Sequence, residues 1–93
     1  MRTIIFSSQY KKDLKLARKR NLPEEELNSV VFNLANDVPL EPRFRDHELS
    51  SQFKGFRECH IRPDWLLLYK KTDSGELQIL ELARTGSHSD IFG

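Results

Sequence analysis

The sequence has only one cysteine, Cys59, among its 93 residues. A single thiol excludes a disulfide within the chain and a zinc site built on several thiolates. No apolar run approaches the roughly 20 residues that span a bilayer, and the first residues lack the long apolar core of a secretory signal. These absences predict a cytoplasmic protein that does not associate with a membrane.

An excess of charge of one sign is also lacking, because 15 basic and 14 acidic side chains leave a net charge of +1. The total charge therefore gives no evidence for or against a nucleic-acid partner. A hydrophobic share of 38% and a charged share of 31% are typical of a globular protein. The length predicts one domain, residues 1–93.

The positive charge is concentrated in the segment Tyr10–Arg20, which has six basic residues and one acidic residue. At helical spacing, Tyr10, Leu14 and Ala17 form an apolar face and most of the basic residues form the opposite face. This basic face consists of Lys11, Lys12, Lys15, Arg18 and Lys19. A basic helix face suits a polyanion, although from the run alone a solvated surface is the commoner explanation.

Hydrophobic periodicity predicts the order strand, helix, helix and then three strands. The expected elements are a strand over 2–6, helices over about 8–20 and 23–36, a loop over 39–53, and strands over 56–61, 65–69 and 77–82 with a turn at 72–75. Ser7 or Ser8 is the expected cap of the first helix, and Asn21 or Leu22 that of the second.

This order predicts an α+β domain with β-α-α-β-β-β topology, in which two N-terminal helices pack on a small, largely antiparallel sheet. Side chains alternate along the strand 56–61, so Cys59 and His60 lie on opposite faces of the sheet. Glu58 shares the face of His60. We therefore expect Cys59 to be chemically inert.

The three histidines, His47, His60 and His88, lie in the second half of the chain, and Asp64 follows His60 across a turn. A metal site is the less favoured explanation, because the histidines are 13 and 28 residues apart and form no close ligand pair. General acid–base catalysis fits better, since histidine gives or takes a proton near neutral pH. Such residues would serve cleavage of RNA by its own 2′-hydroxyl, and equally other phosphodiester or acyl chemistry.

Three motifs occur in order, with the patterns D-H-x-L, H-x-x-P-D-W and R-x-G-x-H-x-x-x-F. They begin at Asp46, His60 and Arg84. Together with the basic segment 10–20 they resemble the YafQ branch of the RelE/ParE superfamily of type II toxins. The resemblance covers essentially the whole chain and is least distinctive between residues 22 and 36.

The resemblance implies a RelE-like fold and a bacterial toxin that enters the ribosomal A site and cuts messenger RNA there without a metal ion or other cofactor. It also implies a cognate antitoxin, usually with a ribbon-helix-helix segment. The antitoxin wraps and blocks the toxin, and the resulting hetero-oligomer can bind operator DNA. The basic helix face would then hold the toxin on ribosomal RNA.

The resemblance further assigns the active site to His47, His60, Asp64, His88 and Phe92, with Trp65 and Arg84 as supporting residues. We expect His47 to act as the base and His88 as the acid, while His60 and Asp64 orient the phosphate or share the proton transfer.

The resemblance also suggests roles for Arg84 and Phe92. Arg84 would stabilise phosphate charge, and Phe92 would stack on a base. Without the resemblance, a core position is the simpler interpretation of Phe92. Trp65, at the start of a strand, is more commonly a core residue than a contact.

Two other classes of function stay open at this point. One is a non-catalytic interaction module, such as a gyrase-poisoning toxin of the ParE branch, which the set of three histidines argues against. The other is a metal-dependent hydrolase that uses the same histidines and Asp64.

Overall fold

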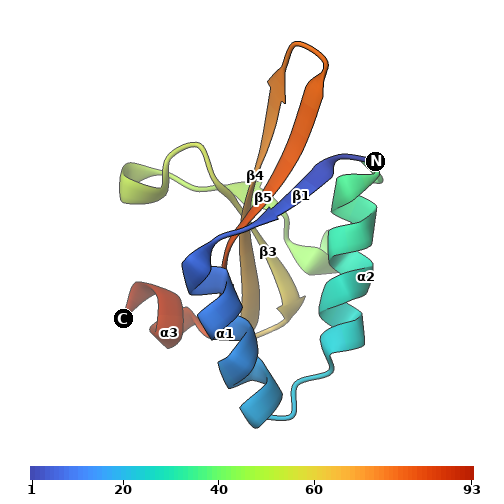
Figure 1. Cartoon of the computed structure of the whole chain (residues 1–93). Coiled ribbons are helices and arrows are strands. Elements are labelled where there is room, and N and C mark those ends of the chain that lie inside the picture. The colour runs from blue at the N-terminus through green and yellow to red at the C-terminus, as the bar shows by residue number, and fades with distance from the viewer.

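A five-stranded mixed sheet with the strand order β1-β5-β4-β3-β2 organises the chain (Figure 1). The computed structural model describes all residues, 1–93. β1 pairs with β5 in parallel, and every other pairing is antiparallel. The elements are β1 (Thr3–Phe6), α1 (Ser8–Lys19), α2 (Glu24–Ala35), β2 (His47–Glu48), β3 (Arg57–Arg62), β4 (Trp65–Ser74), β5 (Leu77–Gly86), α3 (His88–Phe92) and the short 3-10 helices η1 (Pro42–Phe44) and η2 (Ser51–Phe53).

The two faces of the sheet have different coverings. Helices α1 and α2 cover one face, where Cys59 of β3 and Leu67 of β4 belong to the main hydrophobic core. We call this the helix-covered face. The opposite face, which we call the site face, has a small apolar cluster that includes Leu66, Leu68 and Ile91 of α3. The predicted α+β class and the packing of both N-terminal helices on one face are confirmed.

The predicted boundaries of α1 hold, and Ser7 is its cap, since its hydroxyl accepts a hydrogen bond from the Tyr10 N–H. The helix ends where Asn21 adopts a left-handed conformation with φ +58°. The Leu22 N–H then donates to the Ala17 carbonyl at 3.1 Å, which closes a Schellman motif.

The predicted cap of α2 is wrong. Asn21 and Leu22 terminate α1 instead, and Pro23 precedes α2 without any side-chain cap. Negative charge in the first turn, from the three glutamates that begin α2, favours the helix start through the helix dipole.

The loop expected over residues 39–53 contains η1, β2 and η2. β2 has only two residues, too few to give an alternating pattern, and it exists because His47 and Glu48 pair with β3. The part of this segment that includes η2 lies over the site face, where Leu49 and Phe53 pack on the small apolar cluster.

β4 and β5 are longer than predicted, and the expected turn at 72–75 is wrong. The strands pair as far as Ser74 and Leu77, so the turn is at Gly75 and Glu76, with Gly75 at φ +61°. This end of the hairpin projects beyond the rest of the molecule (Figure 1), and its polar sequence reflects solvent on both faces.

The polar C-terminal segment forms a helix, α3, that the sequence pattern did not reveal. Ser87 and Asp90 form a capping box at its start, and Ile91 is buried. One turn of helix is too short to show a periodicity. None of the helices in the chain combines the length and apolar character that a bilayer crossing requires.

Candidate active site

Strand pairing gathers the three histidines near one end of the site face. His47 in β2 lies beside β3, and its ring centroid is 6.5 Å from that of His60. His60 pairs with Leu66 of β4, which pairs with Gly86 of β5. His88 follows two residues later as the first residue of α3. The register therefore places His88 about two strand spacings from His60, roughly 10 Å across the sheet.

His47 is exposed and its tautomer is defined by the backbone. Its Nδ1 lies 2.6 Å from the carbonyl oxygen of Arg45. A carbonyl only accepts, so the neutral ring donates from Nδ1 and leaves the lone pair of Nε2 free. Arg45 presents this carbonyl because it adopts a left-handed conformation, φ +49°, at the end of η1. The arrangement suits a general base.

His60 meets an acceptor at each ring nitrogen. Its Nδ1 lies 3.2 Å from the Pro63 carbonyl oxygen, and its Nε2 lies 3.1 Å from Oε1 of Glu58. The Glu58 side chain is only 7% exposed. A ring that carries both protons can donate one hydrogen bond to each of these oxygens. Sequence reasoning placed Glu58 on the face of His60 and did not assign it to the site, although its position two residues away in the strand was the available signal.

Asp64 fixes the start of α3. Its Oδ1 accepts a hydrogen bond from the backbone N–H of His88 at 3.0 Å. The His88 side chain is exposed, no ring nitrogen of it is hydrogen-bonded, and its ring centroid is 4.8 Å from that of Phe92. Asp64 and His88 are thus brought together through the backbone, which leaves the imidazole free to meet a substrate.

A second set of contacts holds α3 against α1. Arg20 donates to both carboxylate oxygens of Asp90, at 2.6 and 3.2 Å, and the Ser87 N–H donates to Asp90 at 2.9 Å. The Arg20 guanidinium, followed by the bonds from Ser87, lowers the pKa of Asp90 far below its ordinary value. Neither Arg20 nor Asp90 was predicted as part of the site, because their contact joins residues 70 positions apart.

Phe92 has both a packing role and an accessible surface. Its ring meets Phe53 edge to face, with centroids 5.4 Å apart. Both rings line a cavity of about 490 Å³ together with Glu58 and His88. The cavity is large enough for a nucleotide-sized group next to the histidines.

The two residues predicted as supports lie away from this cavity. Trp65 is 2% exposed in the helix-side core and donates from Nε1 to the Thr85 hydroxyl at 2.9 Å, so it is a core residue. The guanidinium of Arg84 donates from Nε to Oδ2 of Asp13 at 2.9 Å, with the Arg84 side chain 25% exposed. Its Nη2 also lies 3.5 Å from the carbonyl oxygen of Asp90, so Arg84 joins β5 to both α1 and α3 and does not line the cavity.

The basic face of α1 is arranged as predicted. Tyr10 and Ala17 are buried and Leu14 is partly buried, whereas the basic side chains are exposed. Arg18 donates to both oxygens of Glu24, at 2.7 and 3.0 Å. The charge that is left without a carboxylate partner on this face belongs to the four residues Lys11, Lys12, Lys15 and Lys19.

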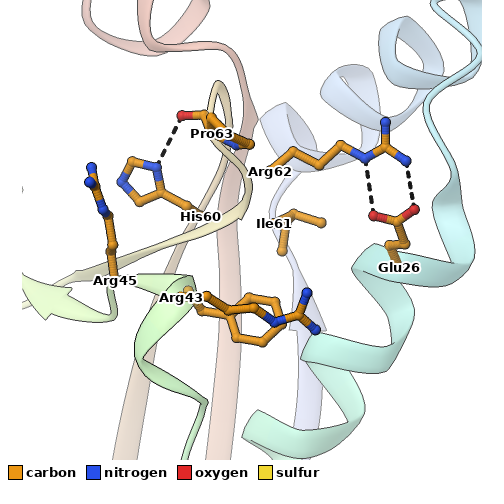
Figure 2. A pocket seen from close by; sticks show the side chains of 8 residues that line it. Glu26, Arg43, Arg45, His60, Ile61, Arg62 and Pro63 are labelled. Atoms are coloured by element: carbon orange, nitrogen blue, oxygen red, sulfur yellow. Dashed lines mark hydrogen bonds and ion pairs between the residues drawn. The ribbon is translucent and has the colours of Figure 1, made fainter.

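A second cavity of about 540 Å³ lies on the other side of His60 (Figure 2). It is lined by Glu26, Arg43, Phe44, Arg45, His60, Ile61, Arg62 and Pro63. Glu58 lines the first cavity and His60 the second, so their contact forms part of the wall between the two.

The remaining candidate chemistry is sparse. No three His, Cys, Asp or Glu side chains are arranged to hold a metal ion. Cys59 is fully buried, and burial raises the pKa of its thiol, so the predicted inertness agrees with its position.

Comparison with known proteins identifies the family. The model of the family described as YafQ, a bacterial toxin of a type II toxin–antitoxin system, matches residues 2–93. The chain is 42% identical over 93 residues to the mRNA interferase toxin YafQ of Escherichia coli K12. The aligned region covers 99% of this chain and 97% of that protein.

Solved structures agree with this assignment. The crystal structure of the E. coli DinJ–YafQ toxin–antitoxin complex matches with a TM-score of 0.88 and 42% identity, over 99% of this chain and 98% of that one. A metal-bound toxin from Helicobacter pylori matches with a TM-score of 0.88 and 43% identity, over 99% and 100% of the chains. The predicted resemblance is therefore confirmed, and this chain belongs to the YafQ family of bacterial toxins of type II toxin–antitoxin systems.

Proposed function

We propose that this chain is an endoribonuclease that cuts messenger RNA in the ribosomal A site and is neutralised by a cognate antitoxin. Its relative in E. coli is an mRNA interferase toxin, and the structural relative there is a complex with the antitoxin DinJ. The observation that carries the proposal is the pair His47 and His60. Their rings lie 6.5 Å apart, one with a free Nε2 and the other bonded at both nitrogens.

The reaction is an attack of the 2′-hydroxyl on the adjacent phosphorus. Nε2 of His47 takes the hydroxyl proton as the new P–O2′ bond forms. The bond from phosphorus to the 5′-oxygen breaks, and His88 in its protonated form gives a proton to that oxygen. The products are a 2′,3′-cyclic phosphate and a 5′-hydroxyl, and no water or metal ion is consumed or required.

The neighbours of these two histidines stabilise the transition state. His60, when protonated and oriented by Glu58 and the Pro63 carbonyl, offers positive charge to the non-bridging phosphate oxygens. Asp64 positions His88 by holding the start of α3. The Phe92 ring, next to the cavity, stacks on a base of the message.

Two further residues support the site from a distance. Arg84 was expected to stabilise phosphate charge directly, and its pairing with Asp13 favours a role in joining β5 to α1 next to α3. Trp65 supports the sheet beneath the site through its bond to Thr85.

The partners follow from the charge distribution and the relatives. The four unpaired lysines of α1 contact ribosomal RNA phosphates without reading sequence. A ribbon-helix-helix antitoxin covers the toxin and forms a hetero-oligomer that binds operator DNA. The cytoplasm, where messages are translated, is the compartment in which the chain acts.

Primer extension on a defined message tests this proposal. Purified protein is incubated with the message, with and without translating ribosomes, next to a His88→Ala variant, and the metal content of the same preparation is measured. Cuts that need ribosomes and His88, made by protein that contains no bound metal, are the expected result. A stoichiometric bound metal whose removal before the assay abolishes the cuts would favour the metal-dependent hydrolase, and growth arrest without any cuts would favour the interaction toxin.

A further inference from the structure

Arg45 is exceptional among the eight arginines of the chain. Each of the other seven has a carboxylate oxygen within 4.0 Å, whereas Arg45 has no ion pair and its side chain makes no hydrogen bond. An unpaired guanidinium is the side chain best suited to bind a phosphate through two parallel hydrogen bonds.

The position of Arg45 is set by the same backbone that orients His47. Its N–H donates to the Pro42 carbonyl at 3.0 Å, and its own carbonyl accepts from His47. The side chain then reaches the cavity of about 540 Å³ that His60 also lines. Arg45 therefore orients His47 through its backbone carbonyl and lines one cavity together with His60 through its side chain.

The cavity has a gradient of charge along its length (Figure 2). Arg45 and His60 lie at one end, and Arg62 lies at the other, where Glu26 neutralises it through bonds of 3.0 and 2.7 Å. Arg43 extends from η1 toward α2, and its guanidinium lies over the Phe44 ring at 4.5 Å from the centroid, with the Glu41 carboxylate 3.7 Å away. The uncompensated charge thus lies at the end next to the histidines.

We infer that this cavity is a nucleotide subsite, in which Arg45 binds the phosphate next to the scissile one. The inference rests on the function proposed above, because it assigns the neighbouring nucleotide of the same message. An RNA strand whose scissile phosphate lies at His47 and His60 must continue past one of the two cavities. The 540 Å³ cavity has the volume of a nucleotide site and the free charge that a phosphate requires.

The test compares the binding of the toxin to two ribosome samples that differ only in whether the A site holds a codon. One is programmed with a message whose A-site codon has 2′-O-methyl groups and cannot be cut by 2′-hydroxyl attack. The other has a message truncated before that codon, so that its A site is empty. The ratio of the two dissociation constants of the toxin isolates the contribution of the message from that of ribosomal RNA.

Arg45→Gln should lower the preference for the filled A site about tenfold, the usual effect of losing a hydrogen bond to a charged group. It should also reduce the salt slope of binding to programmed ribosomes by about 0.7, the value for one single-stranded phosphate contact. Arg45→Lys, which keeps the charge, should recover part of the preference. Lys12→Gln on α1 should weaken binding to both samples equally.

The outcomes separate the subsite from the proposed function. Wild-type toxin that cuts message on ribosomes, with an Arg45→Gln variant that keeps the full preference, would overturn the subsite alone. Wild-type toxin that neither cuts nor prefers the filled A site would overturn both. If Arg45→Gln weakened only the affinity for the antitoxin, the cavity would be a site for an acidic protein segment and the inference would be wrong.

Discussion

The two faces of the sheet use the same strands for different purposes. On the helix-covered face, Cys59 and Leu67 are fully buried among apolar side chains. On the site face, Glu58 and His60, which alternate with Cys59 along β3, form a polar pair between two cavities. Because side chains alternate along a strand, β3 places one set of residues in the hydrophobic core and the other set in the candidate active site. Substitutions on the two faces should therefore have separable effects.

The largest effect on the site face is expected from His47→Ala. Loss of a general base should lower the single-turnover rate of message cleavage on ribosomes about 10²- to 10⁴-fold. Because His47 is exposed, the free energy of unfolding should change by less than about 0.5 kcal/mol. A matching loss of stability in urea would mean that the two faces are not independent.

Substitution of two adjacent leucines tests the difference between the faces. Both are fully buried, Leu67 on the helix-covered face and Leu68 on the site face. Leu67→Ala and Leu68→Ala should each reduce the free energy of unfolding by about 2–5 kcal/mol. Only Leu68→Ala should also lower cleavage by the folded fraction, since Leu68 belongs to the cluster that supports α3. Urea unfolding combined with rate measurements on folded protein checks both statements.

Glu58→Gln should have an intermediate effect, a fall in cleavage of about tenfold. The substitution keeps the shape of the buried side chain and removes the charge that faces Nε2 of His60. The protein should stay folded, as measured by circular dichroism. If the rate were unchanged, Glu58 would be only a structural neighbour of His60.

A smaller effect is expected from Asp90→Ala, which removes the capping box of α3 and the partner of Arg20. Loss of the cap should cost about 1 kcal/mol. The pKa of Asp90 is lowered in the folded state from its ordinary value of 3.8, so the contribution of this carboxylate is complete above about pH 4. It is lost as the pH falls through the folded pKa. The wild-type protein should therefore lose stability below pH 4 more steeply than Asp90→Ala, as urea unfolding over a series of pH values would show.

The smallest effect on cleavage is expected from Cys59→Ala. The thiol lies on the helix-covered face, away from His60, and is fully buried. Cleavage by the folded protein should equal that of the wild type, with a loss of stability of about 1 kcal/mol. Abolished cleavage in a folded variant would contradict the assignment of faces.

The sequence predicts those helices and strands whose hydrophobic pattern extends over several residues. The apolar face of α1 and the alternation of β3 were both found correctly, because each extends over several residues. β2 and α3 were missed, since two residues or one helical turn give no periodicity. β2 is formed by the long-range pairing of His47 with Glu58, and α3 combines a local capping box with the long-range bond from the His88 N–H to Asp64.

Only part of the candidate site follows from the sequence. The motifs give the three histidines, Asp64 and Phe92 as candidates, and these residues lie along one end of the site face. The motifs did not reveal Arg45, whose significance comes from what it lacks, a carboxylate partner. That property depends on the folded arrangement of every acidic side chain around it and cannot be seen in the linear sequence.

The proposed cleavage depends on 2′-hydroxyl attack assisted by the histidines of the site face. The most direct test is to cut a message on ribosomes and identify the chemical ends of the fragments, with a parallel message that has a single 2′-O-methyl group at the cleavage position. We expect a 2′,3′-cyclic phosphate on the upstream fragment, a 5′-hydroxyl on the downstream fragment and no cleavage of the methylated message. A 3′-hydroxyl with a 5′-phosphate, or cleavage of the methylated message, would contradict it.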